Sequence, residues 1–368
     1  MFGIRGKSAV GIDLSFDRVK VCKMAKKKDK YFLLSLGEKK ISPEPLRDDE
    51  KEAWTGHAIE GIKKLLSEHK IKEREVYASV SSNSVVIRYL KLPFMPASEL
   101  REVIRFEAED HIPFEVEQAL IDFHITKEFV DKEERMMEVL LVAAKREAVN
   151  SYLDIFQKAG LEPVYINVDT FATEDAWSIG EEGGVEKEGV IALVDIGART
   201  TNINIIETNA SSFNRDIMVG GNDFTDAIKE EFGLAFSEAE KTKEERGGLL
   251  LGEEYTTITT TESGRVSYAI ESVATRLLDE LDRSFTYYYT QLPSYKKNID
   301  RVILSGGSAI LSNLTTFFSN GLGIDVMVAR PLQMIDLSKT VGLPSDLEKK
   351  GCAFATTIGL ALRGLLTS

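Results

Sequence analysis

The segment from Gly189 to Ile206, GVIALVDIGARTTNINII, places an aspartate and a glycine between two apolar runs. Val190 to Val194 are β-branched or small apolar residues, which is typical of a buried strand. Gly197 permits a tight turn whose backbone N–H groups can hold an anion, while the Asp195 carboxylate can hold a magnesium ion through water. Taken alone, the segment favours an ordinary hairpin with an aspartate in its turn.

The beginning of the chain repeats this plan. An apolar run ends at Asp13, a short turn follows, and a second strand carries Lys20. Late in the chain, an apolar strand at 301–304 leads into the pair Gly306 and Gly307, which leaves room for a base and a ribose ring. The repetition predicts an α/β protein in which two similar halves face one cleft.

Length and composition set broad limits. A chain of 368 residues is too long for one core, so we expect at least two domains. The net charge of −13 argues against general nucleic-acid binding, which needs a positive face. Two cysteines give no disulfide framework, and we find neither an apolar run of membrane-spanning length nor a signal-peptide core. We therefore expect a cytoplasmic protein without direct membrane insertion.

Within the first half, residues 85–161 predict a small separate unit. Apolar strands at 85–92, 119–129 and 137–144 alternate with helices at about 98–111 and 146–159, which gives a β-α-β-β-α order. Ser98 is expected to cap the first of these helices, and Gly160 to end the second.

Three motifs together resemble the actin–Hsp70–sugar-kinase superfamily of ATPases: AVGIDLSFDRVKV, LVDIGARTTNINI and VILSGGSAIL. They are similar to its first and second phosphate motifs and its adenosine motif. The segments YLKLPFMPASELREVIRFEAEDHIPF, GGNDFTDAIKEEFGLAFSEAEKTK and ELDRSFTYYY resemble the PilM family of type IV pilus assembly proteins, which is similar to the cell-division protein FtsA. The resemblance covers nearly the whole chain.

This resemblance implies an actin/Hsp70-like duplicated ribonuclease-H-like fold, with two lobes around a nucleotide cleft and an FtsA-type inserted subdomain. The implied division is 1–84 plus 162–188 for the first core subdomain, 85–161 for the insert, 189–222 plus 300–368 for the second core subdomain, and 223–299 for its accessory subdomain.

The resemblance also implies an ATP site with Mg²⁺ between Asp13 and Asp195, because two carboxylates beside a triphosphate repel it unless a divalent cation lies between them. Lys20 is expected to contact a phosphate. The other implied nucleotide-binding residues are Ser15, Gly197, Ala198, Arg199, Thr200 and Thr201 around the phosphates; Gly220, Gly221 and Asn222 along the cleft; Glu240, Lys243 and Arg283 near the ribose or base; and Gly306, Gly307 and Ser308 at the adenosine.

Two features bear on hydrolysis. Asp169 follows the 164–168 strand, where related proteins carry a residue that orients the attacking water, although a helix N-cap is an equal alternative. Ser15 stands where many superfamily members have glycine, and bulky Phe16 follows it. Either the Ser15 side chain crowds a phosphate or its hydroxyl donates to one. We expect ATP binding, with hydrolysis that is slow or absent.

PilM proteins bind the N-terminal cytoplasmic tail of PilN, in a groove between the first core subdomain and the insert. A peptide there needs apolar pockets, for which the candidates are Leu92, Phe94, Phe106, Ile112 and Phe114, with subdomain core as their alternative role. The resemblance further implies contacts with other platform proteins and the assembly ATPase, self-association, and attachment to the inner membrane through PilN.

The function implied is that of an ATP-binding scaffold of the pilus assembly platform, whose nucleotide state is coupled to assembly of the complex. Two alternatives stay open. A small-molecule kinase of the same superfamily would need a second substrate pocket. An FtsA-like division protein would need an amphipathic membrane helix after a linker, whereas residues 353–368 have the apolar character of a core helix.

Overall fold

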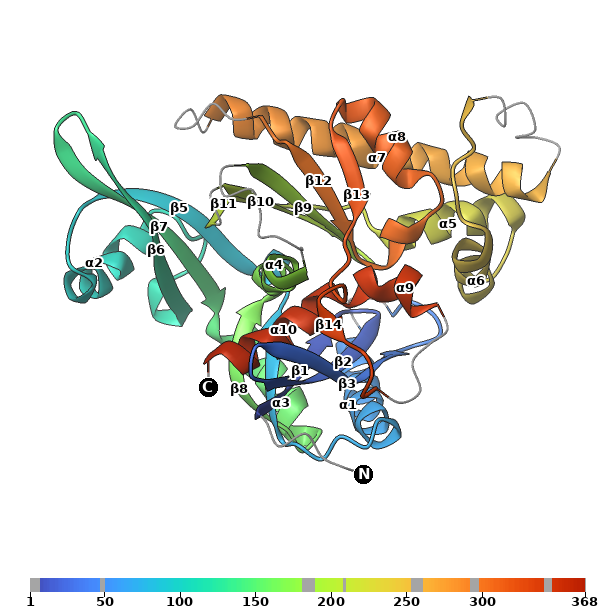
Figure 1. Ribbon diagram of the computed structural model, residues 1–368, viewed down its shortest axis with the longest axis horizontal. Coiled ribbons are helices and arrows are strands. Elements are labelled where there is room, and N and C mark those ends of the chain that lie inside the picture. The colour runs from blue at the N-terminus through green and yellow to red at the C-terminus, as the bar shows by residue number, and fades with distance from the viewer. Residues whose placement is uncertain are drawn as a thin grey trace.

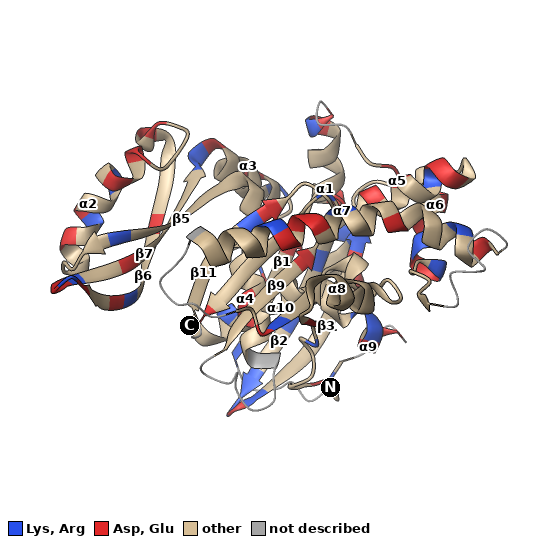
Figure 2. Ribbon diagram, turned by 90° about the horizontal axis from the view of Figure 1, so that it is seen from above, with Lys and Arg blue, Asp and Glu red and all other residues tan. Residues whose placement is uncertain are grey.

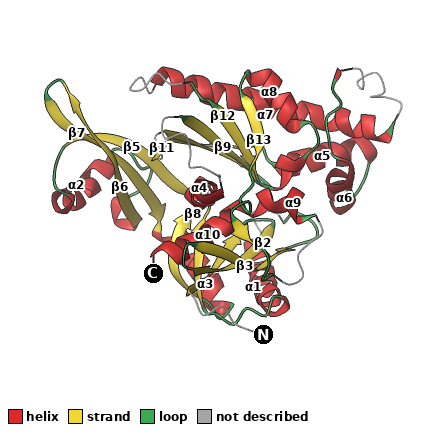
Figure 3. Cartoon of the chain, viewed as in Figure 1, coloured by secondary structure: helices red, strands yellow, loops and turns green. Residues whose placement is uncertain are grey.

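The computed structural model describes residues 7–46, 50–180, 189–207, 210–252, 261–291, 298–340 and 346–367. The chain forms two lobes, each built on a β-sheet, and a third, smaller sheet extends from them to one side (Figure 1). Figure 3 shows that helices cover the sheets of both lobes.

The first lobe contains a six-stranded sheet in the order β14-β3-β2-β1-β4-β8. Its strands are β1 (Lys7–Leu14), β2 (Arg18–Lys27), β3 (Lys30–Lys40), β4 (Glu75–Val80), β8 (Glu162–Val168) and β14 (Ile335–Asp336). The first three form an antiparallel meander, whereas β4 and β8 continue the sheet parallel to β1.

The second lobe contains a five-stranded sheet in the order β11-β10-β9-β12-β13. Its strands are β9 (Val190–Ile196), β10 (Thr201–Glu207), β11 (Ala210–Ile217), β12 (Arg301–Ser305) and β13 (Asp325–Val328). Again three antiparallel strands come first, and two parallel strands follow on the other side of the first one. The shared topology confirms the duplication predicted from the two aspartate turns.

Four helices sandwich the first sheet. Apolar residues of α1 (Lys51–Glu68) and α3 (Arg146–Lys158) pack on one face. On the other face α10 (Ala355–Thr367) packs against β1 and β2 and also against α4 (Asp169–Gly180). Gly359 permits that close approach, because a Cβ atom there would overlap the backbone of Ala172.

Alternate residues of β9 serve two cores, which explains its continuous apolar run. Val190, Ala192 and Val194 face helices α5 (Gly221–Phe232), α6 (Phe236–Arg246), α7 (Glu262–Gln291) and α8 (Leu314–Leu322). On the opposite face Ile191 and Leu193 pack around Trp177 of α4. Helix α4 therefore lies between the two sheets, as Figure 1 shows, and a short helix, α9 (Leu347–Lys350), leads toward α10.

The small sheet has the antiparallel order β5-β7-β6, formed by β5 (Val85–Pro93), β6 (Ala119–Asp131) and β7 (Glu134–Lys145). Helix α2 (Ala97–Glu109) packs on it through Leu100, Ile104 and Ala108. This confirms the predicted β-α-β-β-α order. Ser98, however, lies inside the first turn of α2, because the helix begins directly after Pro96.

The subdomain boundaries stay a prediction, to which we propose two changes. Helix α3 contributes Ile155 and Phe156 to the core under the first sheet, and α10 packs on the opposite face of that sheet. We would count both helices with the first core subdomain.

Among the described residues, no helix combines the length and hydrophobicity that crossing a bilayer requires. Acidic and basic positions are interspersed over most elements (Figure 2).

Candidate functional site

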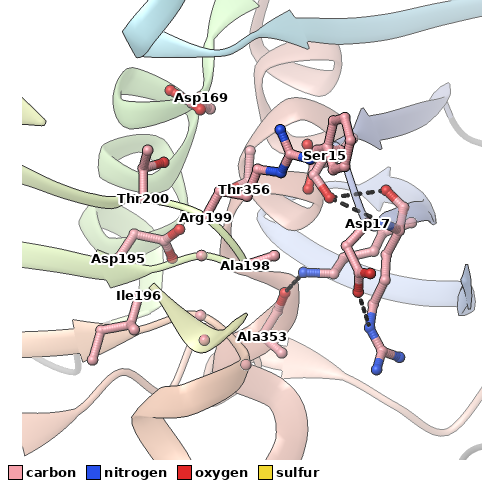
Figure 4. Close-up of a pocket in the computed structure, with 18 of the residues that line it drawn as sticks. Ser15, Asp17, Asp169, Asp195, Ile196, Ala198, Arg199, Thr200, Ala353 and Thr356 are labelled. Atoms are coloured by element: carbon pink, nitrogen blue, oxygen red, sulfur yellow. Dashed lines mark hydrogen bonds and ion pairs between the residues drawn. The ribbon is translucent and has the colours of Figure 1, made fainter. Parts of the chain in front are cut away.

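A cavity of about 540 Å³ lies between the two lobes, where the turns after β1 and β9 meet. Figure 4 shows Asp195, Ala198 and Thr200 on one side of it and Ser15 and Asp17 on the other. The site residues predicted from the sequence that line this cavity are Asp13, Ser15, Lys20, Asp169, Asp195, Gly197, Ala198, Arg199, Thr200, Gly221, Asn222, Glu240, Lys243, Gly306, Gly307 and Ser308.

Three of the predicted nucleotide-binding residues, Thr201, Gly220 and Arg283, do not line this cavity. Thr201 is fully buried, and its hydroxyl donates to the carbonyl oxygen of Val219 at 2.7 Å. Gly220 packs behind the turn, where a Cβ atom would come within 2.7 Å of the Ala198 carbonyl oxygen. Both residues therefore support the turn from outside. Arg283 lies on the exposed side of α7, and the structure does not bring it to the cavity.

Asp195 owes its position to the sheet. It lies near the end of β9, opposite Ser305 on the parallel strand β12, and the Ser305 hydroxyl donates to Asp195 Oδ1 at 2.6 Å. Burial raises the pKa of Asp195, while the Ser305 hydrogen bond and the Lys20 charge act in the opposite direction. The carboxylate is thus oriented by a neighbour that the sequence analysis did not single out.

Asp13 is the counterpart of Asp195 in the first lobe and pairs in register with Lys20 across the β1–β2 ladder. Burial raises the pKa of Asp13; the Lys20 charge lowers it and the Asp195 charge raises it further. Lys20 Nζ donates to the carbonyl oxygen of Ala353 at 2.5 Å, just before α10. The cavity therefore brings together the buried carboxylate of Asp13, the half-buried carboxylate of Asp195 and one ammonium group.

Asp169 begins α4, and its Oδ1 accepts hydrogen bonds from the backbone N–H of Ser82 at 2.9 Å and of Thr170 at 2.7 Å. Burial raises its pKa to about 7, and the charges of Asp13 and Asp195 add to that rise against the Ser82 hydrogen bond. Because the carboxyl group both lines the cavity and accepts N–H groups where the helix begins, the geometry is compatible with both roles left open by the sequence.

Helix α6 contributes a buried ion pair to the cavity wall. Lys243 Nζ lies 2.7 Å from Glu240 Oε2 and donates to the carbonyl oxygen of Gly221 at 2.9 Å. Burial lowers the pKa of Lys243, and Glu240 opposes this. Burial alone would raise the pKa of Glu240, but Lys243 brings it below its usual value. The pair fixes α6 to the first turn of α5, beside Asn222.

The turn after β12 depends on glycine. Gly306 has φ +88°, and a Cβ atom there would overlap the backbone of Ile196. At Gly307, which lines the cavity, a Cβ atom would by contrast meet no protein atom within 4 Å. That a base or ribose ring approaches this wall stays a prediction.

Ser15 and Phe16 make contacts within and around the first turn, and their effect on a phosphate stays a prediction. The Ser15 hydroxyl donates to the carbonyl oxygen of Arg18 at 3.0 Å, inside its own turn. The guanidinium carbon of Arg199 lies 3.1 Å from the centroid of the Phe16 ring. The same ring stacks on Trp54, with 6.0 Å between the two ring centroids. Phe16 and Trp54 also line the cavity, and the sequence offered no signal for that pairing.

The donor set fits a magnesium-bound phosphate group. Two carboxylates from opposite lobes and one lysine suit a cation and an anion bound together. The described ranges hold no group of three or more His, Cys, Asp or Glu placed to bind a metal on their own. A magnesium ion would therefore take its remaining ligands from water and phosphate oxygens.

A second cavity, of about 270 Å³, lies between α1, α3 and the strands β4, β5 and β7. Its apolar wall includes Val80, Val85, Ala144, Val149 and Ile155. It shares Lys51, Trp54, Ser84 and Tyr152 with the first cavity.

The five residues proposed for a peptide groove lie elsewhere. Leu92 and Ile112 are buried in the core of the small sheet, and Phe114 packs against it. Phe94 is partly exposed and Phe106 is 72% exposed. None of the five belongs to the lining of either cavity described above.

Two sheets of one topology around a cavity with a carboxylate from each define a protein of the actin-like ATPase fold. Within that class, the chain belongs to the type IV pilus assembly protein PilM family, whose model matches residues 11–365. A solved PilM–PilN type IV pilus biogenesis complex contains a chain 27% identical to this one, with a TM-score of 0.80 over 97% of this chain and 98% of that one.

More distant relatives share the fold. MreB5 of Spiroplasma citri bound to ADP has a TM-score of 0.52 and 15% identity, with 95% of each chain covered. The cell shape-determining protein MreB of Escherichia coli K12 is 24% identical over an alignment of 241 positions that covers 57% of this chain and 68% of that protein. These matches do not favour the kinase and division-protein alternatives.

Proposed function

We propose that this chain is the ATP-binding, actin-like scaffold of a type IV pilus inner-membrane assembly platform, and that it recruits the N-terminal cytoplasmic tail of PilN. The observation that carries the nucleotide part is the meeting of Asp13 and Asp195, from equivalent turns of the two lobes, in one cavity. Family membership and the PilM–PilN complex support the rest.

In this proposal Asp13 and Asp195 hold Mg²⁺ through water, and the ion supplies the positive charge that lets a triphosphate lie between two carboxylates. Lys20 contacts a phosphate oxygen. The backbone N–H groups of residues 197–200 surround the phosphates, and Gly307 leaves space for the adenosine. Asp169 either orients a water molecule or acts only as the N-terminal cap of α4, and hydrolysis is slow or absent.

The second cavity is our proposed site for the PilN tail, in place of the five residues chosen from the sequence. It lies where the first sheet and the small sheet meet, and its wall is mainly apolar, as side chains of a bound peptide require. Binding there attaches the chain peripherally to the inner membrane without insertion of its own. Other platform proteins, the assembly ATPase and further copies of the chain are additional proposed partners.

Calorimetry with the purified chain tests both parts. ATP should bind in the presence of Mg²⁺, and Asp195→Asn, which keeps the shape but removes the charge, should lower the affinity at least about tenfold. Equal affinity of the variant and the wild type would contradict the cleft assignment. A synthetic peptide of the PilN tail from the same organism should bind, and Val149→Glu in the second cavity should abolish binding. A peptide that binds this variant as tightly would exclude that site.

A further inference from the structure

The two cavities share a wall made by one aromatic side chain from each of two helices. Tyr152 of α3 and Trp54 of α1 line both cavities. Tyr152 Oη donates to the carbonyl oxygen of Leu14 at 3.1 Å, and Trp54 Nε1 donates to the carbonyl oxygen of Phe16 at 2.8 Å. The two acceptors flank Ser15 in the turn that follows Asp13.

We propose that Tyr152 and Trp54 are positioning residues through which a nucleotide in the first cavity and a peptide in the second strengthen each other's binding. This inference rests on the proposed function and adds the route by which nucleotide state regulates the peptide site. The residues that move together are the two rings and the turn from Leu14 to Phe16.

The argument starts from the turn. A phosphate group beside Asp13 and Ser15 fixes the backbone of this turn, and with it the directions of the two carbonyl groups. Each carbonyl accepts a hydrogen bond from a ring that also faces the second cavity, and such bonds weaken steeply away from their preferred geometry. Fixing the turn therefore fixes the rings that a peptide must contact.

The same contacts act in reverse, because coupling between two binding sites is reciprocal. A peptide packed on Tyr152 and Trp54 holds the rings, and the rings hold the turn in the arrangement that the nucleotide uses. Burial raises the pKa of the Tyr152 hydroxyl, and the charges of Asp13 and Asp169 raise it further, so the group remains a proton donor. Phe16 adds a second link, because its ring stacks on Trp54.

The test is a binding cycle measured by calorimetry with the full chain, the synthetic PilN-tail peptide, and the ATP analogue AMPPNP with Mg²⁺. In the wild type, AMPPNP should tighten peptide binding by about fivefold or more. Tyr152→Phe and Trp54→Phe each keep an aromatic ring but remove one hydrogen-bond donor, and each should reduce this ratio to less than about twofold. Tyr289→Phe is the matched control, because that hydroxyl lies on α7 outside both cavities and accepts the N–H of Ile299.

The outcomes separate this inference from the proposed function. A wild-type protein that binds both ligands without coupling, or a coupling ratio retained in both Tyr152→Phe and Trp54→Phe, overturns the inference alone. A wild-type protein that fails to bind either ligand overturns the proposed function and the inference together. Coupling lost in one or both variants and kept in Tyr289→Phe supports the inference. Thermal unfolding checks that each variant is folded. If one of the two variants does not fold, the other still tests the inference.

Discussion

The guanidinium group of Arg18 reaches across the cleft and donates a hydrogen bond to Glu244 Oε1 at 2.9 Å. Arg18 belongs to β2 of the first lobe and Glu244 to α6 of the second. Arg199 makes the opposite crossing: it lies over the Phe16 ring, and its Nη2 donates to the carbonyl oxygen of Leu46 at 2.9 Å. An arginine from each lobe therefore contacts the other lobe across the cleft.

Weakening the first of these contacts should speed nucleotide release. Glu244→Gln removes the charge that faces Arg18, and Glu244 is partly exposed, so the pair contributes only about 0.2–1 kcal/mol. We expect the dissociation rate of a fluorescent ATP analogue to rise about two- to fivefold at low salt. The control is Glu245→Gln on the same helix, whose carboxylate lies 3.9 Å from Lys241 of its own helix. Equal rates in both variants would show that Arg18–Glu244 does not hold the cleft closed.

The features that could be predicted from the sequence are those that residues close together in the chain determine. An aspartate after an apolar run identified the turns after β1 and β9, and a glycine pair identified the turn after β12, because strand ends and tight turns are determined by neighbouring residues. Lys20 pairs with Asp13 within one hairpin. Its contact with Ala353, 333 positions away, depends on how α10 packs, and no local pattern reports that.

Because local patterns do not report packing, some predicted residues lie outside the sites to which the sequence assigned them. Arg283 lies on a long helix, but periodicity does not say whether that helix reaches the cavity. The apolar residues chosen for a peptide groove, such as Leu92 and Ile112, serve the core of the small sheet instead. Apolar character alone does not distinguish a core residue from a groove residue, whereas the position of the second cavity depends on the packing of α1 and α3.

Removing the Ser305 hydroxyl should destabilise the protein more at neutral than at acidic pH. Its hydrogen bond favours the ionised form of Asp195, so Ser305→Ala leaves a half-buried carboxylate without that donor once the group ionises. We expect a loss of about 1–3 kcal/mol in the free energy of unfolding at pH 7.5, measured in urea. Ser319→Ala, which removes a hydroxyl that donates to Ile324, is the control and should lose a similar amount at all pH values. A pH-independent loss in Ser305→Ala would contradict the prediction.

Glu174 should make the protein less stable as pH rises. Burial raises the pKa of Glu174 to about 7, and the Asp175 charge adds to this against the hydrogen bond from Asn204. The folded state therefore binds a proton more tightly than the unfolded state, and the stability from this group is full below pH 4.5 and lost as pH rises through about 7. Glu174→Gln imitates the protonated form. Its melting temperature should match the wild type at pH 4.5 and exceed it at pH 7.5; a constant difference across this range would refute the prediction.

Substitutions of the two glycines after β12 should have different effects: Gly306→Ala should lower stability, and Gly307→Ala should lower nucleotide affinity. Gly306→Ala forces a side chain into φ +88° and into the backbone of Ile196, so we expect a loss of about 3 kcal/mol or more in the free energy of unfolding. Gly307→Ala adds a methyl group that meets no protein atom within 4 Å, so its stability should change by less than about 1 kcal/mol.

Nucleotide binding is therefore measured on the Gly307→Ala variant. Gly307 lines the cavity, so we expect the added methyl group to keep a base or ribose ring away from the turn. The affinity for ATP with Mg²⁺, measured by calorimetry, should then fall about tenfold or more. If Gly307→Ala folds normally and binds ATP as tightly as the wild type, the turn after β12 does not contact the nucleotide. The adenosine would then have to lie against another part of the cavity wall.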